Sequence, residues 1–571
     1  MQDERLARRL GVEYFRLPPP KPSKGQHGDY LPFVRFPLWH FCGRCRMMKE
    51  SSWNEPFPPR CESPFPPSRF KAEPCAQLPE KKRWRMIPLR FIVACENGHV
   101  DDFPWSLWVH RKKGESLKSA QVCADPQLRF ENTGKAGLIG LLVKCEACGE
   151  KRSMMGSAGP NSLKDLTCSG KRPWLGSEGS EICDAENPPI MLQRGATNLY
   201  FPKIASAILI PPFSNQLRRL IDDPHVWKSL SEGMKEGEMP DDGRLRFFAN
   251  LQRIDLDGLR QAVSEKVKGT GLIDDIQDEE AFRYSEYRAL LSTSSRMEEG
   301  FVTVMQLMGQ YKPMVREYFQ QVVLVEKLAE TRALTGFSRI QPPPRREYDP
   351  EDRRQLALQP PPWLPAIRVY GEGIFLALNK QSIDRWLGEA LRRRYDEILR
   401  QHQAIYVRLN REPRELPSMF FLLHTLAHVL IRRLSYDCGY GSSSLRERIY
   451  CSEDPNRLMH GILIYTAAGD SEGTMGGLVQ QGKPEHLEQL LLGAVQDALW
   501  CSNDPLCIES HGQGIDSLNR AACHACALLS ETSCEEGNRF LDRVALIGSA
   551  SHPEVGFFEA TGRVIMEGAR G

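Results

Sequence analysis

The sequence predicts an α+β protein made of several domains, and three observations support this prediction. With 571 residues, the chain is longer than a single hydrophobic core usually organises. Its composition, 41% hydrophobic and 26% charged residues, is that of a folded globular protein. Its 17 cysteines form two blocks, ten from Cys42 to Cys183 and seven from Cys438 to Cys534, with none between them. We therefore expect regions of different structure along the chain.

Residues 1–200 are predicted to be a cysteine-rich N-terminal region of short strands and turns. Residues 1–40 contain a proline run and should form an extended arm that leads into it. Beyond the arm, Cys, Pro, Gly and Trp are frequent, and the apolar runs are short, as at residues 90–94 and 138–143. This pattern is typical of strands and turns arranged around metal-binding cysteines.

Residues 201–340 are predicted to form a helical middle region. They contain no cysteine, and apolar residues recur with a helical period, for example at residues 301–309 and 318–333. Two proline clusters follow and enclose a charged segment. Because proline fixes φ and lacks an amide donor, we expect residues 341–365 to be a Pro-rich interdomain linker.

Residues 366–571 are predicted to form a mixed α/β C-terminal domain. A hairpin or strand pair should open it at residues 366–378, and a buried strand should lie at residues 461–466. Helices are expected over three segments, residues 381–411, 418–434 and 484–499.

Charge and hydropathy exclude two classes of protein. The 75 Lys and Arg nearly balance 73 Asp and Glu, so bulk positive charge does not hold this chain on nucleic acid, although a local basic groove remains compatible. The longest apolar stretch, residues 419–431, is shorter than the about 20 residues that span a bilayer. The first ten residues carry charges from Asp3 onward and lack the apolar segment of a secretory signal. We expect a cytoplasmic protein that makes no membrane contact.

The cysteines indicate metal sites. An odd number cannot all pair as disulfides, and a chain in a reducing compartment should keep them free. Cysteines that only fill a core would be scattered, whereas these cluster around C-x-x-C pairs. Four thiolates around one ion are typical of structural zinc. We expect two or three Zn²⁺ ions, since the spacings match no familiar iron–sulfur run.

The clearest metal site is predicted near the C-terminal end. Cys523 and Cys526 form a C-x-x-C pair, and Cys534 follows eight residues later. Two upstream thiols, Cys501 and Cys507, compete for the remaining position, and we favour Cys507 with Cys501 as its substitute. Four thiolates would leave no open position on the ion, so this site should be structural.

Two further zinc sites are predicted in the N-terminal region, and each starts from a C-x-x-C pair. The first set is Cys145, Cys148, Cys168 and Cys183. The second set is Cys42, Cys45, Cys61 and Cys75. The ligands of the second set stay open, because three other residues compete for places in it: Cys95, His99 and Cys123.

Two motifs of enzymes are incomplete. Residues 477–484 nearly fit the phosphate-binding loop G-x4-G-K-[ST], but Pro484 replaces the hydroxyl residue that would hold Mg²⁺, and no strand directly precedes it. His424 and His428 lie at i and i+4 on a predicted helix, yet Thr425 follows the first His where a metalloprotease has Glu. We expect a surface turn and two core histidines, and no ATPase.

A glycine-rich acidic turn follows the strand at residues 461–466. It could bind a ligand or simply allow the next helix to pack closely. A cryptic metal-dependent nuclease or hydrolase that uses Asp470, Glu472 and the two histidines is the alternative interpretation of this region.

Basic residues are grouped only locally. One group is residues 392–394 with Arg400, in a predicted helix. Another surrounds Trp84 and consists of Lys81, Lys82, Arg83 and Arg85. A basic run with an embedded aromatic ring can contact phosphates and stack on a base, although a solvated charged face has the same composition.

Several long segments are specific enough to indicate a family. They include LLHTLAHVLI (422–431), GYGSSSLRERIY (439–450), GILIYTAAGDSEGTMGGL (461–478) and RFIVACENGHVDDFPW (90–105). These segments resemble the DrmB family, accessory subunits of the bacterial DISARM anti-phage system, and the resemblance covers most of the chain. The family's cysteine-rich domain is shared with MrfA-like repair helicases, in which it binds one zinc through four cysteines.

The resemblance implies a zinc-binding subunit that works beside a DrmA-like helicase and, with it, binds foreign DNA in a hetero-oligomer such as a heterodimer. The zinc ligands carry over directly to Cys523, Cys526 and Cys534, while Cys501 and Cys507 both remain candidates for the fourth. The motor motifs of the MrfA-like helicases are missing from this sequence. The resemblance therefore implies the partner of a motor, and not an enzyme.

Overall fold

A computed structural model gives the structure of the chain. The described residues are all of 1–571 except 2, 20–32, 54, 56–57, 113, 177–178, 211–219, 222–223, 233–237, 253, 255, 269–277, 293–299, 343–349, 409–412, 414, 442, 467–475 and 569–571. Within them, no helix combines the length and the hydrophobicity that crossing a bilayer requires.

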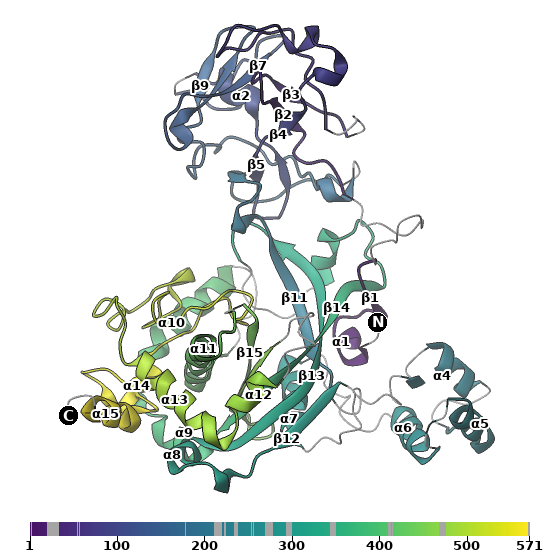
Figure 1. Cartoon of the computed structure of the whole chain (residues 1–571), viewed down its shortest axis with the longest axis vertical. Coiled ribbons are helices and arrows are strands. Elements are labelled where there is room, and N and C mark those ends of the chain that lie inside the picture. The colour runs from purple at the N-terminus through teal and green to yellow at the C-terminus, as the bar shows by residue number, and fades with distance from the viewer. Residues whose placement is uncertain are drawn as a thin grey trace.

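A seven-stranded sheet forms the centre of the molecule (Figure 1). Its longest strands, β13 (Phe319–Ser338) and β14 (Trp363–Leu378), are antiparallel, with Phe319 opposite Leu378 and Ala333 opposite Ala366. The strand order is β11-β13-β14-β16-β15, where the others are β11 (Phe201–Ile208), β16 (Met459–Thr466) and β15 (Leu445–Ser452). Two short strands extend it, β12 (Phe301–Met305) beside β13 and β1 (Tyr14–Arg16) parallel to β14.

Both faces of this sheet are covered. Ile374 and Leu376 of β14 pack into the main core, whereas Phe375 and Ala377 point to the opposite face and join a second core with Tyr287. This alternation follows from the two-residue period of a strand. Because both sets are apolar, the strand is a continuous hydrophobic run.

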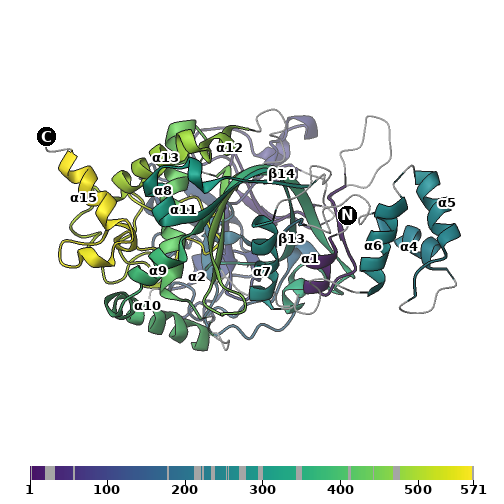
Figure 2. The ribbon, with the colours of Figure 1, turned by 90° about the horizontal axis from the view of Figure 1, so that it is seen from below.

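Helix α11 (Ser418–Cys438) is the centre of the main core and is buried along most of its length. Figure 2 shows it on one side of the sheet with most other C-terminal helices, whereas α1 and α7 lie on the opposite side. The helices of the first side are α8 (Pro313–Tyr318), α9 (Lys380–Trp386), α10 (Glu389–Arg408), α12 (Gly477–Gln481), α13 (Pro484–Ala498), α14 (Val544–Ile547) and α15 (Glu559–Gly568). Those of the other side are α1 (Glu4–Arg9) and α7 (Glu279–Leu290).

The N-terminal region stands at one end of the long strands and contains three small sheets (Figure 1). Its core is aromatic, with Trp105 and Trp108 of α2 (Trp105–His110) packed against Phe103. The first sheet is β3-β2-β4, with β2 (Trp39–Cys42), β3 (Met48–Glu50) and β4 (Met86–Pro88). The second is β10-β5-β6, with β5 (Phe91–Ala94), β6 (Val100–Asp102) and β10 (Ile190–Gln193). The third is β7-β8-β9, with β7 (Leu128–Asn132), β8 (Leu141–Cys145) and β9 (Lys151–Ser153).

Three helices form a separate small cluster beside the sheet (Figure 1). They are α4 (Pro224–Ser231), α5 (Asp242–Gln252) and α6 (Leu256–Lys268). Short 3-10 helices complete the chain: η1 (Cys75–Gln77), η2 (Glu80–Lys82), η3 (Leu138–Gly140), η4 (Pro173–Leu175), η5 (Thr197–Leu199), η6 (Met308–Gln310), η7 (Pro350–Gln355), η8 (Ile515–Ser517) and η9 (Pro553–Val555).

The mixture of helices and sheets matches the predicted fold class, but parts of the middle region differ from the prediction. The helices expected at residues 301–309 and 318–333 are wrong, because residues 301–305 form β12 and residues 319–333 lie in β13. Residues 322–325 are four consecutive buried apolar residues, and a strand buried on both faces lacks the alternation that distinguishes it from a helix. The described residues of this region do contain helices, among them α4 to α8.

The segment at residues 341–365, expected to separate two domains, instead connects two neighbours in one sheet. It joins β13 to β14, which are hydrogen-bonded along much of their length. Its residues 350–355 form η7, and residues 343–349 lie outside the described part of the chain. The strand pair expected at residues 366–378 is a single strand, in which Gly371 lets the Thr466 carbonyl approach where a Cβ would stand.

The first residues of the N-terminal arm are not extended as predicted. Helix α1 begins at Glu4 with Asp3 as its N-cap, and Leu6, Leu10 and Phe15 are fully buried against the central sheet. The helices and strand predicted for the C-terminal domain correspond to α9, α10, α11, β16 and α13.

Candidate metal centres

Five groups of metal-binding side chains occur among the described residues. Each has four members whose ligand atoms lie within 4.8 Å of one another. All 17 cysteines are free, and neighbouring sulfurs in the groups are 3.5–3.9 Å apart. Zn–S bonds of about 2.3 Å in tetrahedral geometry separate two sulfurs by about 3.8 Å. The cysteines are therefore spaced as zinc ligands are.

The first group consists of Cys42, Cys45, Cys61 and Cys75, the second N-terminal set predicted from the sequence. Strand β2 ends at Cys42, and the chain then turns back through Arg46, whose φ is 65°. The backbone amides of Arg44 and Cys45 donate to Cys42 Sγ at 3.4 and 3.5 Å. Hydrogen bonds from the thiols of Cys45 and Cys61 lower the pKa of Cys42, which favours the thiolate that a metal requires.

The second group is Cys95, His99, Cys168 and Cys183. The turn between β5 and β6 carries Cys95 and His99, and Cys95 Sγ lies 3.3 Å from His99 Nδ1 and 3.8 Å from Cys183 Sγ. The other ring nitrogen of His99, Nε2, is 2.7 Å from Glu181 Oε1. Such a carboxylate contact is the usual way to orient a histidine ligand.

The third group is His110, Cys123, Cys145 and Cys148. His110 is the last residue of α2, and its Nδ1 donates to the Ser106 carbonyl at 2.7 Å. A neutral ring held in this way presents the lone pair of Nε2 to Cys148 Sγ, which is 3.2 Å away. Cys123 and Cys145 have their sulfurs 3.7 Å apart.

The first N-terminal set predicted from the sequence, Cys145, Cys148, Cys168 and Cys183, is therefore not brought together. Strand β8 and the turn after it place the C-x-x-C pair at the end of α2, whereas the two lone cysteines reach the β5–β6 turn. From the sequence, His99 and Cys123 were predicted only as competitors for the first group, and His110 was not predicted to bind a metal. The C-x3-H spacing of Cys95 and His99 was the available signal for the second group.

The fourth group is Cys501, Cys507, Cys523 and Cys526. The sulfur of Cys523 is 3.5 Å from that of Cys501 and 3.7 Å from that of Cys526, and Cys507 lies 3.7 Å from Cys526. The structure thus uses both upstream thiols, and it corrects the predicted set, which contained Cys534 in place of Cys501. Cys501 follows α13 closely, so the loop after this helix wraps the C-x-x-C turn.

The fifth group is His424, His428, Glu447 and Cys534, which come from α11, β15 and the C-terminal loop. Cys534 belongs here because its loop passes over β15, where the amide of Glu447 donates to the Ser533 carbonyl at 3.1 Å. The two histidines are buried in the core as expected, but they face two further ligand side chains. The sequence analysis missed Glu447, which lies in a strand and far from any cysteine pair.

Two parts of the chain match models of known protein families. Residues 1–201 match a domain of unknown function, DUF8724, and residues 426–527 match the MrfA Zn-binding domain. The second match contains the whole fourth group and ends before Cys534. The chain is also 32% identical to the DISARM protein DrmB of Bacillus paralicheniformis, over 98% of this chain and 95% of that protein. The chain belongs to the DrmB family. Zinc is accordingly a cofactor of this DrmB-family chain.

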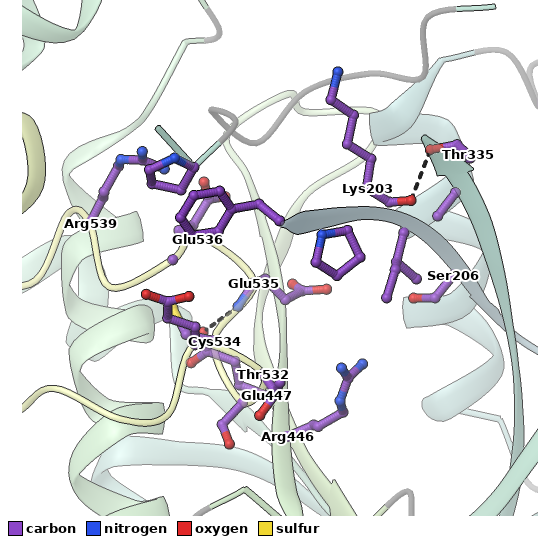
Figure 3. Close-up of a pocket in the computed structure, with 18 of the residues that line it drawn as sticks. Lys203, Ser206, Thr335, Arg446, Glu447, Thr532, Cys534, Glu535, Glu536 and Arg539 are labelled. Atoms are coloured by element: carbon purple, nitrogen blue, oxygen red, sulfur yellow. Dashed lines mark hydrogen bonds between the residues drawn. The ribbon is translucent and has the colours of Figure 1, made fainter. Parts of the chain in front are cut away.

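A pocket of about 350 Å³ opens beside the fifth group (Figure 3). Glu447 and Cys534 line it, together with Arg446, Glu535 and Lys203. Its charges are largely paired with one another, since Lys203 lies 2.7 Å from Asp352 and Arg283 lies 2.8 Å from Glu535. In this DrmB-family chain the pocket is therefore not a strongly basic surface.

Of the motifs that suggested an enzyme, the His424–His428 pair belongs to the fifth group, whereas the near match to a phosphate-binding loop contributes no residue to any of the five groups. In the DrmB-family chain, residues 477–481 form α12 and Pro484 begins α13, so the near match to a phosphate-binding loop spans two helices. Asp470 and Glu472 lie outside the described residues. Among the described residues, the carboxylate next to the two histidines is that of Glu447.

Proposed function

We propose that this chain is the non-motor, zinc-binding subunit of a DISARM anti-phage complex, where it pairs with a DrmA-like helicase and helps to bind foreign DNA. The observation that carries the proposal is the similarity to DISARM protein DrmB along nearly the whole chain. The family match to a zinc-binding domain named after MrfA supports a role beside a helicase, because the chain has no complete ATPase motif of its own.

Zinc at the first four groups would act as a structural element. Each group offers four Cys or His ligands, and four protein ligands leave no open position on a tetrahedral ion. Three of these groups lie in the N-terminal region, whose sheets have three short strands each. Metal bonds would hold such short elements in a fixed arrangement, because the free energy of metal binding adds directly to that of folding.

The surface next to the first group supplies a DNA contact. Trp84 is 52% exposed, and its backbone carbonyl accepts a hydrogen bond from the Cys61 amide at 2.9 Å. Its ring packs over Gly43 within the C-x-x-C turn. Lys81, Lys82 and Arg85 are exposed around it. The zinc group would thus present an aromatic ring for base stacking between cations for phosphates.

Two of the basic residues noted in the sequence, Arg83 and Arg394, are less available for a DNA contact because they bind other parts of the chain. Arg83 donates to the carbonyls of Ala76 and Leu78, and so it stabilises the loop of the first group. In α10, Arg394 makes two hydrogen bonds to the buried Asp542 at 2.6 and 3.0 Å. A variant that tests α10 as a DNA-binding face should therefore change Arg392 and Arg393 only.

We expect Trp84→Ala to weaken the binding of single-stranded DNA by the helicase complex about 5- to 150-fold, the usual effect of losing one stacked base. Lys81→Ala with Lys82→Ala should weaken it too and reduce the slope of log Kd against log salt by about 0.7 for each lost phosphate contact. The measurement is a fluorescence-anisotropy titration of labelled DNA at several salt concentrations.

Trp500→Ala is the matched control, because this tryptophan is 71% exposed and follows α13, far along the chain from the first group. Its Kd should equal that of the wild type. Co-purification of each variant with the helicase shows that the complex is intact. Equal Kd values for the wild type and Trp84→Ala would contradict this DNA contact, and failure of the wild-type chain to bind the helicase would contradict the proposed function itself.

A further inference from the structure

The fifth group differs from the others in composition, with two histidines, one carboxylate and one thiol. His424 Nε2 lies 3.0 Å from Glu447 Oε1 and 3.2 Å from Cys534 Sγ, and His428 Nε2 lies 3.5 Å from the same carboxylate oxygen. All four side chains are at least nine-tenths buried. Tetrahedral zinc with bonds of about 2.0–2.3 Å separates its ligand atoms by about 3.3–3.6 Å. The group thus has the dimensions of a single ion's coordination shell.

The hydrogen bonds outside the group orient its atoms as ligands. His428 Nδ1 donates to the Ala527 carbonyl at 2.8 Å, which leaves the lone pair of Nε2 facing the centre. The backbone amide of Asn538 donates to Cys534 Sγ at 3.2 Å, and that of Glu535 donates to Glu447 Oε1 at 3.0 Å. Amides donate to ligand sulfurs in the same way in the first group.

Direct hydrogen bonds between the four side chains would leave some of their buried polar atoms without a partner. His428 Nε2 and Glu447 Oε2 are buried and have no hydrogen-bond partner. The lone pair of a neutral His428 would face a carboxylate oxygen, and a buried polar atom without a hydrogen-bond partner destabilises the fold. If Cys534 is a thiolate, as a metal ligand must be, its charge repels the Glu447 carboxylate unless a cation lies between them. A divalent ion removes both problems at once.

The geometry does not fit a nucleophile activated by a histidine. In a Cys–His–acid relay the thiol and the carboxylate contact opposite ring nitrogens. Here Cys534 Sγ and Glu447 Oε1 both lie next to Nε2 of His424. The four side chains converge on one point, as ligands do.

We propose that His424, His428, Glu447 and Cys534 bind a fifth zinc ion, separate from the one held by the MrfA Zn-binding domain. The mixed N, O and S donor set suits zinc, which accepts all three. The ion would join α11, β15 and the C-terminal loop. The pocket lined by Glu447 and Cys534 gives it a route in from solvent (Figure 3).

Zinc content of the purified full-length chain tests this proposal. By elemental analysis and native mass spectrometry we expect five zinc ions per wild-type chain and four in Cys534→Ser and in Glu447→Gln, which keeps the shape of the side chain. The combination Cys526→Ser with Cys534→Ser should hold three. His460→Gln is the control, because this buried histidine lies outside the group, and it should retain five.

A measurement on the unchanged sequence keeps the test independent of variant folding. Cadmium-113 NMR of the cadmium-substituted wild type should show one resonance far from the sulfur-rich ones, since this site has one sulfur ligand and the other four have three or four. Four zinc ions with sulfur-rich resonances alone would overturn the proposal. The zinc count does not depend on the binding of DNA or of a helicase. The proposal of a fifth zinc ion and the proposed function can therefore each fail while the other stands.

Discussion

Replacing Cys526 with serine is expected to remove one zinc ion and to unfold the loops around the fourth group. Cys526 is 5% exposed, and its sulfur lies 3.7 Å from those of both Cys507 and Cys523. Zinc supplies about 10–16 kcal/mol of folding free energy in zinc-finger peptides. Loss of only about 4 kcal/mol would lower the Tm of a unit of 150–250 residues by about 8–16 °C.

The measurement is zinc per chain together with thermal unfolding followed by circular dichroism. Cys438→Ser is the matched control, because Cys438 is exposed and lies outside all five groups, and it should leave both values unchanged. A Cys526→Ser variant that kept the wild-type zinc content and Tm would show that the fourth group holds no ion. Treating the wild type with a strong chelator should reproduce the lower Tm, and zinc addition should restore it.

The spacing of cysteines along the sequence predicts some of the metal-binding groups but not others. The set from Cys42 to Cys75 is assembled within one small sheet and its adjoining loops, so spacing along the chain was enough to group its members. The ligands of the other groups come from separate elements. Strand pairing decides which lone cysteine lies next to which C-x-x-C pair. The spacing of cysteines along the chain contains no information about strand pairing. A histidine such as His110, at the end of an apolar helix, has the same local pattern in the sequence as a core residue.

The helices and strands around the central sheet were also only partly predictable from the sequence. Helices α11 and α13 were predictable because their length and apolar pattern match a helix and nothing else. Strand β13 was not, since a run that is buried on both faces has no alternation of its own. The glycines of β14 suggested a turn, but at Gly371 the structure uses the missing Cβ to bring two strands together.

The second large effect is expected at Glu286, which connects α7 to the central sheet. Its two carboxylate oxygens accept hydrogen bonds from Arg448 at 2.7 and 2.9 Å, and the Ile208 amide and Tyr450 hydroxyl donate to it as well. Glu286 is fully buried and Arg448 is 1% exposed. Removing one partner of such a pair leaves a buried charge unpaired, which costs about 3–5 kcal/mol.

We therefore expect Glu286→Ala to lower the Tm by about 6 °C or more, measured by differential scanning calorimetry. Glu389→Ala is the control, because Glu389 pairs with Arg393 on the surface, where both side chains are about three-quarters exposed. Exposed pairs contribute at most about 1 kcal/mol. Equal Tm values for the two variants would show that the buried network does not stabilise the fold.

The pH dependence gives a second readout of the same pair. Burial alone would raise the pKa of Glu286, but the Arg448 and Arg5 guanidiniums lower it below the ordinary value. A carboxyl whose pKa is lower in the folded state stabilises the fold above its unfolded pKa, about 4.3, and loses that contribution as the pH falls through the folded value. The stability difference between the wild type and Glu286→Gln should thus stay constant from about pH 8 to 5 and shrink below about pH 4. A difference that already shrinks between pH 8 and 5 would mean that the carboxyl is not held in its ionised form by Arg448.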